Sequence, residues 1–378
     1  RKEENTMKKA AVVVLLLAGV AAVAGEAGIM DGFGNFVADV QAEDELPDNE
    51  KAQNESEEVT GEEEDSASKI DTSITIGTGS RIAVVSKATD GEYWKLVHRG
   101  MEDAVKDINT AYDFSSNDAV TMTFEGPSDE QDVETQINTL DAVIAENPTV
   151  LCMSASDIES CQAQLEAASE NGIPVVVFDS NVNEDELVAA FRGTDNTYVG
   201  KLAAEKLADA IGGSGKIAVF SAQEKTESSQ KRVEGFKETL TEYPDITIVS
   251  ELYTDKVDDM ETAMVDVLNR YPDLSGVFCT NEDVSDLYLG LDKGEKAPVM
   301  VGVATTVQQK AIADGQELGT VSQDPYAIGY QTIIAAAQAM STDVQKAAEV
   351  EKNVLLEPKW IDASNISDET NSNYLYSK

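Results

Sequence analysis

Short runs of consecutive apolar residues alternate with helical patterns from residue 81 to the end of the chain. The run at 82–85 is followed by Val97, Met101 and Ile108 at helical spacing. Similar runs lie at 150–153, 175–178, 217–220, 246–249, 277–278 and 299–301. Continuous apolar runs between helices are typical of parallel strands covered on both faces. The length of this region is about that of two domains. We therefore predict two doubly wound α/β lobes built on parallel sheets.

Charge and residue usage exclude several classes of function. The chain has 71 Asp and Glu residues against 28 Lys and Arg residues, a net charge of -43. This charge repels phosphate backbones and anionic lipid, so we expect no nucleic-acid partner. The single histidine argues against catalytic triads and most zinc sites, and three cysteines cannot form a disulfide scaffold. We expect no metal and no cofactor.

The first residues have the pattern of an export signal. Four basic residues lie among the first nine, and an apolar run at 10–24 ends in small residues. We predict a cleaved signal peptide at 1–25, with a retained membrane anchor as the alternative. Val23, Ala24 and Gly25 resemble the start of a bacterial lipobox, but Glu26 stands where that box needs cysteine. We therefore expect no lipid anchor.

Residues 26–80 differ in composition from the rest of the chain. Acidic residues dominate this stretch, which contains only Lys51 and Lys69 as basic residues and few large apolar groups after Val40. Such a segment cannot bury enough apolar surface to fold. We predict an acidic disordered tether over 26–80.

Polar and aromatic side chains follow the predicted strands. In open α/β sheets, ligands bind beyond the carboxyl ends of the strands. Neutral hydrogen-bonding groups, single carboxylates and two aromatic rings suit a neutral polyhydroxylated ligand. The side chains placed there are Asp90, Tyr93, Trp94, Ser154, Asp179, Ser180, Asn281 and Gln323.

Polar and aromatic residues that follow strands can also have purely structural roles. Ser156 and Asp157 are typical helix caps, as is Asn196. Trp94 precedes Val97 and Met101 at helical spacing, so it could belong to a helix core. These alternatives stay open from the residues alone.

No catalytic or nucleotide-binding motif is complete. The glycine-rich segment at 212–215 resembles a phosphate loop, but Ile217 stands where serine or threonine is required, so we predict a turn. His98 is expected on a helix surface. Cys152 and Cys161 could pair or remain free buried thiols, and Cys279 would be left without a partner.

The order of short motifs resembles the ribose/galactose-type sugar-binding proteins of bacterial ABC importers, which have the type I periplasmic-binding-protein fold. The resemblance covers about residues 81–366, and no single motif is specific by itself. The matching stretches include 90–94, Arg99-Gly100, Gly126-Pro127, 171–176, 193–196 with Gly200, 232–236, 271–273, 280–282, and 323–325 with Gly329-Tyr330.

The resemblance implies two lobes joined by three hinge strands, with a ligand between them. The first lobe would comprise 81–193 plus 324–356, and the second 194–323 plus 357–378. Tyr93 and Trp94 would stack on a sugar ring. The residues implied as hydrogen-bonding partners of sugar hydroxyls are Asp90, Ser154, Asp179, Ser180, Arg232, Asn281 and Gln323.

Two positions depart from the family pattern. Ser180 lies where ribose-type members carry arginine, which removes a strong donor. Ala304 lies where the family usually has aspartate, so a carboxylate that accepts sugar hydroxyls is missing. These departures leave the fold and the class intact but make the identity of the sugar uncertain.

We therefore predict an exported solute-binding protein that captures a small sugar and delivers it to an ABC import permease. We expect a monomer, located in the periplasm or at the surface of a bacterium. One alternative is a ligand-sensing module for a receptor kinase. Another is a secreted carbohydrate-active enzyme, which would need two carboxylates such as Asp90 and Asp179 across the cleft.

Overall fold

The computed structural model describes residues 70–293, 299–303 and 306–376. The predicted signal peptide, the tether up to residue 69 and Ala304 lie outside these residues. None of the helices found there is long and apolar enough to cross a membrane.

The first sheet has six strands among the described residues, in the order β11-β5-β4-β3-β1-β2. All of its neighbouring strands run parallel. Its strands are β1 (Arg81–Val85), β2 (Thr121–Glu125), β3 (Val150–Met153), β4 (Val175–Phe178), β5 (Ala190–Thr194) and β11 (Asn353–Leu356).

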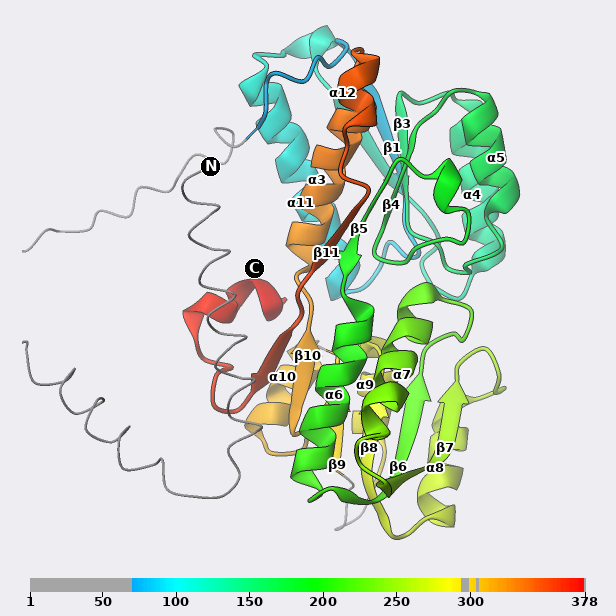
Figure 1. The fold of residues 1–378 in the computed structure, drawn as a ribbon, viewed down its shortest axis with the longest axis vertical. Coiled ribbons are helices and arrows are strands. Elements are labelled where there is room, and N and C mark those ends of the chain that lie inside the picture. The colour runs from blue at the N-terminus through cyan, green and yellow to red at the C-terminus, as the bar shows by residue number, and fades with distance from the viewer. Residues whose placement is uncertain (1–69, 294–298, 304–305, 377–378) are drawn as a thin grey trace, which may run out of the picture. The chain divides into compact units, whose positions relative to one another are not determined.

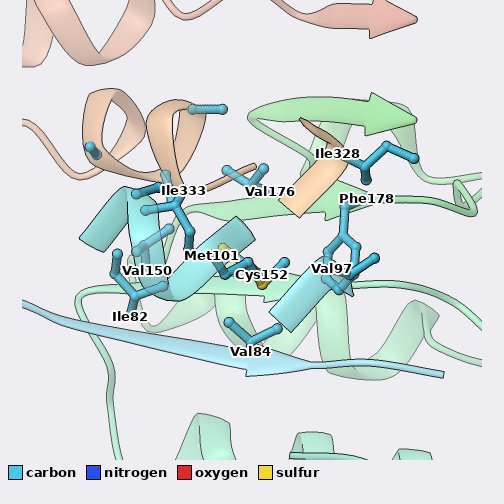
Figure 2. Packing of buried hydrophobic residues seen from close by; sticks show 14 of the residues in the cluster. Ile82, Val84, Val97, Met101, Val150, Cys152, Val176, Phe178, Ile328 and Ile333 are labelled. Atoms are coloured by element: carbon cyan, nitrogen blue, oxygen red, sulfur yellow. The ribbon is translucent and has the colours of Figure 1, made fainter. Parts of the chain in front are cut away.

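Helices cover both faces of this sheet because successive strand residues point to opposite sides. Ile82 and Val84 pack with α3 (Glu92–Ala111) and α11 (Pro325–Ala339), as Figure 2 shows for part of this cluster. Ala83 and Val85 pack on the other face, against α4 (Val133–Ala145) and α5 (Gln162–Glu170). The continuous apolar run at 82–85 is therefore a strand buried on both faces.

The second sheet repeats this arrangement with the described strand order β12-β10-β9-β8-β6-β7. Ile217 and Val219 pack under α6 and α7, whereas Ala218 and Phe220 pack under α8 and α9. The strands are β6 (Ser214–Ser221), β7 (Asp245–Tyr253), β8 (Leu274–Cys279), β9 (Val299–Gly302), β10 (Gly319–Ser322) and β12 (Lys359–Asp362). The helices are α6 (Asn196–Ala210), α7 (Glu227–Leu240), α8 (Met260–Arg270), α9 (Glu282–Gly290) and α10 (Thr306–Ala313).

In each lobe, a glycine allows two helices to pack in close contact. A Cβ atom on Gly100 would overlap the backbone of Tyr326, so α3 and α11 can touch only without it. In the second lobe, a Cβ atom on Gly200 would overlap the backbone of Arg232 and thereby separate α6 from α7. Figure 1 shows both helix pairs packed side by side. The second pair fixes the backbone of a predicted ligand-binding arginine.

The chain passes between the two sheets three times. It leaves the first sheet after β5, returns between β10 and α11, and crosses again between β11 and β12 (Figure 1). The backbone N–H of Asp195 donates to the carbonyl of Leu356 at 3.0 Å, which ties two of these crossings together. The prediction of two parallel-sheet α/β lobes joined by three strands is confirmed.

Several local expectations are wrong. The predicted tether extends to Ser80, but Ile76 and Ser80 are buried and Tyr112 donates to the carbonyl of Ile74 at 2.5 Å. Isoleucines at 70, 74 and 76 give this acidic stretch an apolar side that packs on α3. Asn196 is not the cap of α6, because Asp195 accepts from the Tyr198 N–H. The short β12 pairs antiparallel with β10.

Candidate ligand-binding site

Two neighbouring hollows lie between residues of the two lobes. A cleft of about 760 Å³, here called the mouth cleft, contains Trp94 from the first lobe and Asp286 from the second. A cavity of only about 30 Å³, here called the narrow cavity, is lined by residues of both lobes, including Asp179 and Arg232. Glu130 and Glu282 line both hollows. The narrow cavity thus lies beside residues that follow strands of both sheets, where the sequence predicts a ligand site.

A buried ion pair forms the floor of the site in the first lobe. The Lys87 ammonium lies 2.9 Å from the Asp179 carboxylate and 3.6 Å from Glu130. Burial alone would lower the pKa of Lys87, but the Asp179 and Glu130 carboxylates outweigh it and raise that pKa. Burial would likewise raise the pKa of Asp179, but Lys87 and Tyr93 hold it below its usual value. Both partners are therefore charged at neutral pH.

Backbone conformation directs the Asp179 carboxylate to this position. Asp179 follows β4 with a φ angle of 60°, in the left-handed region that few non-glycine residues adopt. Its N–H donates to the Arg192 carbonyl at 2.8 Å, which holds the turn. Its carboxylate accepts from Tyr93 at 2.5 Å, Ser180 at 3.0 Å and Ser154 at 3.3 Å. Asp179 is the centre of the first lobe's polar groups.

Tyr93 and Trp94 lie in the first turn of α3, and their rings contact each other. Their ring centroids are 5.1 Å apart and their planes meet at 81°. The Trp94 indole N–H donates to Glu130 at 2.8 Å, and only 2% of the residue is exposed. Trp94 belongs to the hydrophobic core of the first lobe and also lines the mouth cleft. Burial and the Asp179 carboxylate raise the pKa of Tyr93 well above its usual value, so the phenol keeps its proton.

The lobes contact each other directly beside the narrow cavity. The Ser180 hydroxyl, which accepts from Lys87 at 3.0 Å, also lies 3.0 Å from the Ser228 hydroxyl of the second lobe. Nearby, the Thr226 hydroxyl donates to the Ser156 carbonyl at 2.9 Å. These contacts join the N-terminal end of α7 to the loops after β3 and β4.

Arg232 is the main cation of the second lobe's half of the site. Its side chain is buried on α7 and donates to the Asn196 amide oxygen at 2.8 Å and the Thr280 carbonyl at 2.7 Å. Both acceptors belong to the second lobe, so the guanidinium is held by its own scaffold. Five N–H donors on an arginine leave others available for a ligand.

Asn281 and Gln323 line the narrow cavity but are also part of the scaffold. Asn281 caps α9 by accepting from the Val284 N–H at 3.2 Å. The Gln323 amide oxygen accepts from Thr194 at 2.9 Å, which links two of the chain crossings. Their amide N–H₂ groups are the parts that a ligand could use.

The mouth cleft is strongly acidic. Burial, followed by the Asp283 carboxylate, raises the pKa of Glu282 well above its usual value. Partial burial and the Glu130 carboxylate raise the pKa of Asp283 to about 6. The carboxyl side chains lining the cleft are Asp90, Asp129, Glu130, Glu261, Glu282, Asp283 and Asp286. An anionic ligand would meet unfavourable charge at this opening.

The structure brings the predicted site residues together in three groups. Tyr93, Asp179, Arg232, Asn281 and Gln323 line the narrow cavity. Asp90, which is exposed, and Trp94 line the mouth cleft. Ser154 and Ser180 line neither hollow and contact the site through Asp179. Their roles toward a ligand stay predictions.

The two hollows are also lined by residues that were not predicted from the sequence: Lys87, Glu130 and Glu282. Lys87 lies just after β1, so its position at a strand end was a usable signal. A lysine is rarely buried unless it is paired, and the carboxylates that pair with Lys87 lie far away in the sequence. Its Nζ atom lies 3.0 Å from Ser180 Oγ. A cation therefore contacts Ser180, the position where the resemblance implies that an arginine donor is missing.

Other side chains outside the two hollows have structural roles. Asp157 accepts from the N–H groups of Glu159 and Ser160 in the turn before α5, but Cys161 is the N-cap of that helix, so the prediction of a helix cap at Ser156 or Asp157 is wrong. Cys152, Cys161 and Cys279 are all free and buried. His98 stacks on Phe124 at the surface of α3, with a centroid distance of 4.3 Å. Across the residues placed in the structure, no cluster of three or more His, Cys, Asp or Glu side chains could hold a metal ion.

Comparisons with known proteins agree with this geometry. A family model described as a periplasmic binding protein domain matches residues 82–343. The D-allose-binding periplasmic protein of Escherichia coli is 24% identical over 281 residues, which cover 71% of this chain and 85% of the relative. The D-ribose/D-allose-binding protein of Pseudomonas aeruginosa is 25% identical over 295 residues, covering 73% and 88%.

A solved structure has a fold similar to that of this chain. The ABC transporter solute-binding protein from Agrobacterium vitis with bound D-fucose is 27% identical and has a TM-score of 0.71. The alignment covers 79% of this chain and 100% of that protein.

Proposed function

Because the chain belongs to the periplasmic binding protein family, we propose that it is an exported solute-binding protein for a neutral monosaccharide. The family consists of binding proteins and is not a class of enzymes. The single observation that carries the proposal is the convergence of Asp179 from the first lobe and Arg232 from the second on one cavity. Hydroxyl groups of a sugar can donate to the first and accept from the second.

Aromatic and polar groups in the site suit a sugar ring. Tyr93 and Trp94 offer apolar ring surface at the edge of the polar groups. Lys87 lies beside Ser180 and takes the place of the donor that ribose-type members supply as arginine. Hydrogen bonds from charged groups to ligand hydroxyls contribute about 1.5–3 kcal/mol each.

Ligand entry requires the lobes to separate. The narrow cavity of about 30 Å³ is far below the roughly 300–1,000 Å³ of ordinary ligand pockets. The Ser180–Ser228 contact and the Thr226–Ser156 bond span the two lobes and must break before a sugar can enter. A sugar that contacts both lobes then favours the closed arrangement. We propose that this closed form docks on the permease of an ABC importer.

The acidic mouth cleft favours neutral over anionic sugars. Seven carboxyl groups line it, and burial, followed by neighbouring carboxylates, raises the pKa values of Glu282 and Asp283. A sugar phosphate would bring further negative charge into this field.

A thermal-shift panel tests the proposal. The panel contains D-ribose, D-allose, D-arabinose, D-fucose and D-tagatose, with D-ribose 5-phosphate as the charged match of D-ribose. A specific sugar at one hundred times its dissociation constant should stabilise the protein by about 2.7 kcal/mol. We expect at least one neutral sugar to do so and the phosphate to have no effect. Stabilisation by the phosphate alone, or by none of the compounds, would contradict the proposal.

A further inference from the structure

Tyr376 comes from the second lobe's end of the chain but packs in the first lobe. It follows β12 and the short helix η4 (Glu369–Tyr374), yet it belongs to the hydrophobic cluster that includes Tyr93 and Ile328. Only 6% of Tyr376 is exposed. Its ring centroid lies 6.1 Å from that of Tyr93, with the planes at 64°. A tail residue therefore reaches the ring that lines the narrow cavity.

Second-lobe side chains hold this tail in place. The Ser322 hydroxyl donates to the Tyr374 carbonyl, and the Gln309 amide donates to the Leu375 carbonyl. Tyr376 itself has a φ angle of 49°, in the left-handed region that is unfavourable for an aromatic residue. Such a conformation persists only where surrounding contacts impose it.

The Tyr376 hydroxyl is buried without a hydrogen-bond partner among the residues that the structure places. Buried polar groups in native proteins are nearly always paired, so an orphaned one requires an explanation. Three of the charged side chains that act on this hydroxyl line the narrow cavity: Glu282, Arg232 and Asp179. Burial, followed by the Glu282 carboxylate, raises the pKa of Tyr376 well above its usual value. The phenol therefore keeps a proton that it can donate.

We propose that Tyr376 is a further ligand-contacting residue, whose hydroxyl donates a hydrogen bond to the sugar held between the lobes. This inference rests on the proposed function. In the ligand-free protein the hydroxyl stays unpaired at a cost in stability, and a sugar oxygen supplies its partner. The tail thereby adds a third aromatic residue to Tyr93 and Trp94.

A ligand-free melting experiment provides the first test. Tyr376→Phe removes the hydroxyl and keeps the ring against Tyr93. Because no hydrogen bond is lost, we expect the variant to melt at the wild-type temperature or about 1–3 °C above it. Tyr374→Phe, a half-buried tyrosine two residues earlier in the same tail, serves as the matched control and should melt like the wild type. A lower melting temperature for Tyr376→Phe would show that the hydroxyl is already paired and overturn the inference.

Calorimetric titration with D-ribose and with D-allose provides the second test. We expect Tyr376→Phe to bind about tenfold more weakly than the wild type, and Tyr374→Phe to bind like the wild type. Equal or tighter binding by Tyr376→Phe overturns the proposed role of Tyr376 but leaves the proposed function intact. A wild-type protein that binds no sugar of the neutral panel overturns the proposed function and the inference with it. The two failures are thus distinguishable.

Discussion

The two lobes contribute to the site in different ways. In the first lobe, Lys87, Asp179 and Tyr93 bond mainly to one another, around a buried ion pair. In the second lobe, Arg232 is bonded to a backbone carbonyl and to Asn196, and Asn281 caps a helix. The first half of the site is a network of side chains, whereas the second half is anchored to secondary structure.

This difference has consequences for ligand binding. A sugar must compete with the internal bonds of Asp179 in the first lobe, so binding there exchanges one set of hydrogen bonds for another. Arg232 can add a ligand bond without giving up those to Thr280 and Asn196, because the guanidinium has further N–H donors. We therefore expect substitutions in the first half to act mainly on stability and those in the second half mainly on affinity.

The largest effect should come from breaking the buried ion pair. Asp179→Asn leaves the Lys87 ammonium buried beside a neutral amide, which should destabilise the protein by about 3–5 kcal/mol. Urea unfolding measures this loss. Adding Lys87→Met should restore part of the stability, since the second charge is then also removed.

An exposed ion pair provides the matched control. Lys216 and Asp273 are as close, at 2.7 Å, but their side chains are 44% and 62% exposed. Asp273→Asn should change the unfolding midpoint little. Equal losses for the two aspartates would contradict the buried network described for the first lobe.

Arg232→Ala should weaken sugar binding by about ten- to a hundredfold, because it removes charge-assisted donors from the cavity. Titration calorimetry gives the affinity, and circular dichroism checks that the fold persists. Arg99→Ala, at an exposed arginine of α3, should bind sugar like the wild type. Unchanged affinity in Arg232→Ala would remove this residue from the second lobe's half of the site.

Substitutions at the two glycines should distinguish an effect on helix packing from an effect on sugar binding. Gly100→Ala and Gly200→Ala should each destabilise the protein by about 1–3 kcal/mol, because each added methyl overlaps the backbone of the facing helix. Only Gly200 faces Arg232, so only Gly200→Ala should also weaken sugar binding. Urea unfolding and calorimetry on both variants test this, and equal affinity losses would contradict it.

The smallest effect concerns Asp283 at the acidic mouth. Its pKa of about 6 exceeds the value near 4 expected in the unfolded chain, so folding favours the protonated form. The wild type should therefore gain stability relative to Asp283→Asn as the pH falls from 7 toward 5. Parallel melting curves across this pH range measure the difference, and a wild type that loses stability relative to the variant would reverse the sign.

The fold could be predicted because the central strands carry continuous apolar runs. Three strands without a buried apolar run gave no such signal. β2 has half-buried residues between two exposed ends, β11 alternates exposed and half-buried residues, and β12 is largely half-buried. The short β5 is buried but contains Arg192 and Gly193, which interrupt an apolar pattern. The edge strands β2, β11 and β12 were therefore not predicted, whereas β7 at the remaining edge was predicted from its run at 246–249.

The site was predictable where residues follow strand ends directly. Asp179 and Asn281 follow β4 and β8, and both line the narrow cavity. Lys87 was missed because its partners Asp179 and Glu130 are far away in the sequence. Tyr376 was missed because its placement depends on a tail that crosses to the other lobe, a contact that no local pattern encodes.

Tryptophan fluorescence tests most directly whether sugar binds between the lobes. Of the two tryptophans, Trp94 lines the mouth cleft and Trp360 lies on β12, bonded to Asp362 at 2.7 Å. Trp360→Phe leaves Trp94 as the sole reporter, and its emission should change on titration with the panel sugar that binds, saturating at the dissociation constant measured by calorimetry. Trp94→Phe should lose most of the signal. A response that persists in Trp94→Phe and is absent in Trp360→Phe would contradict an interlobe site.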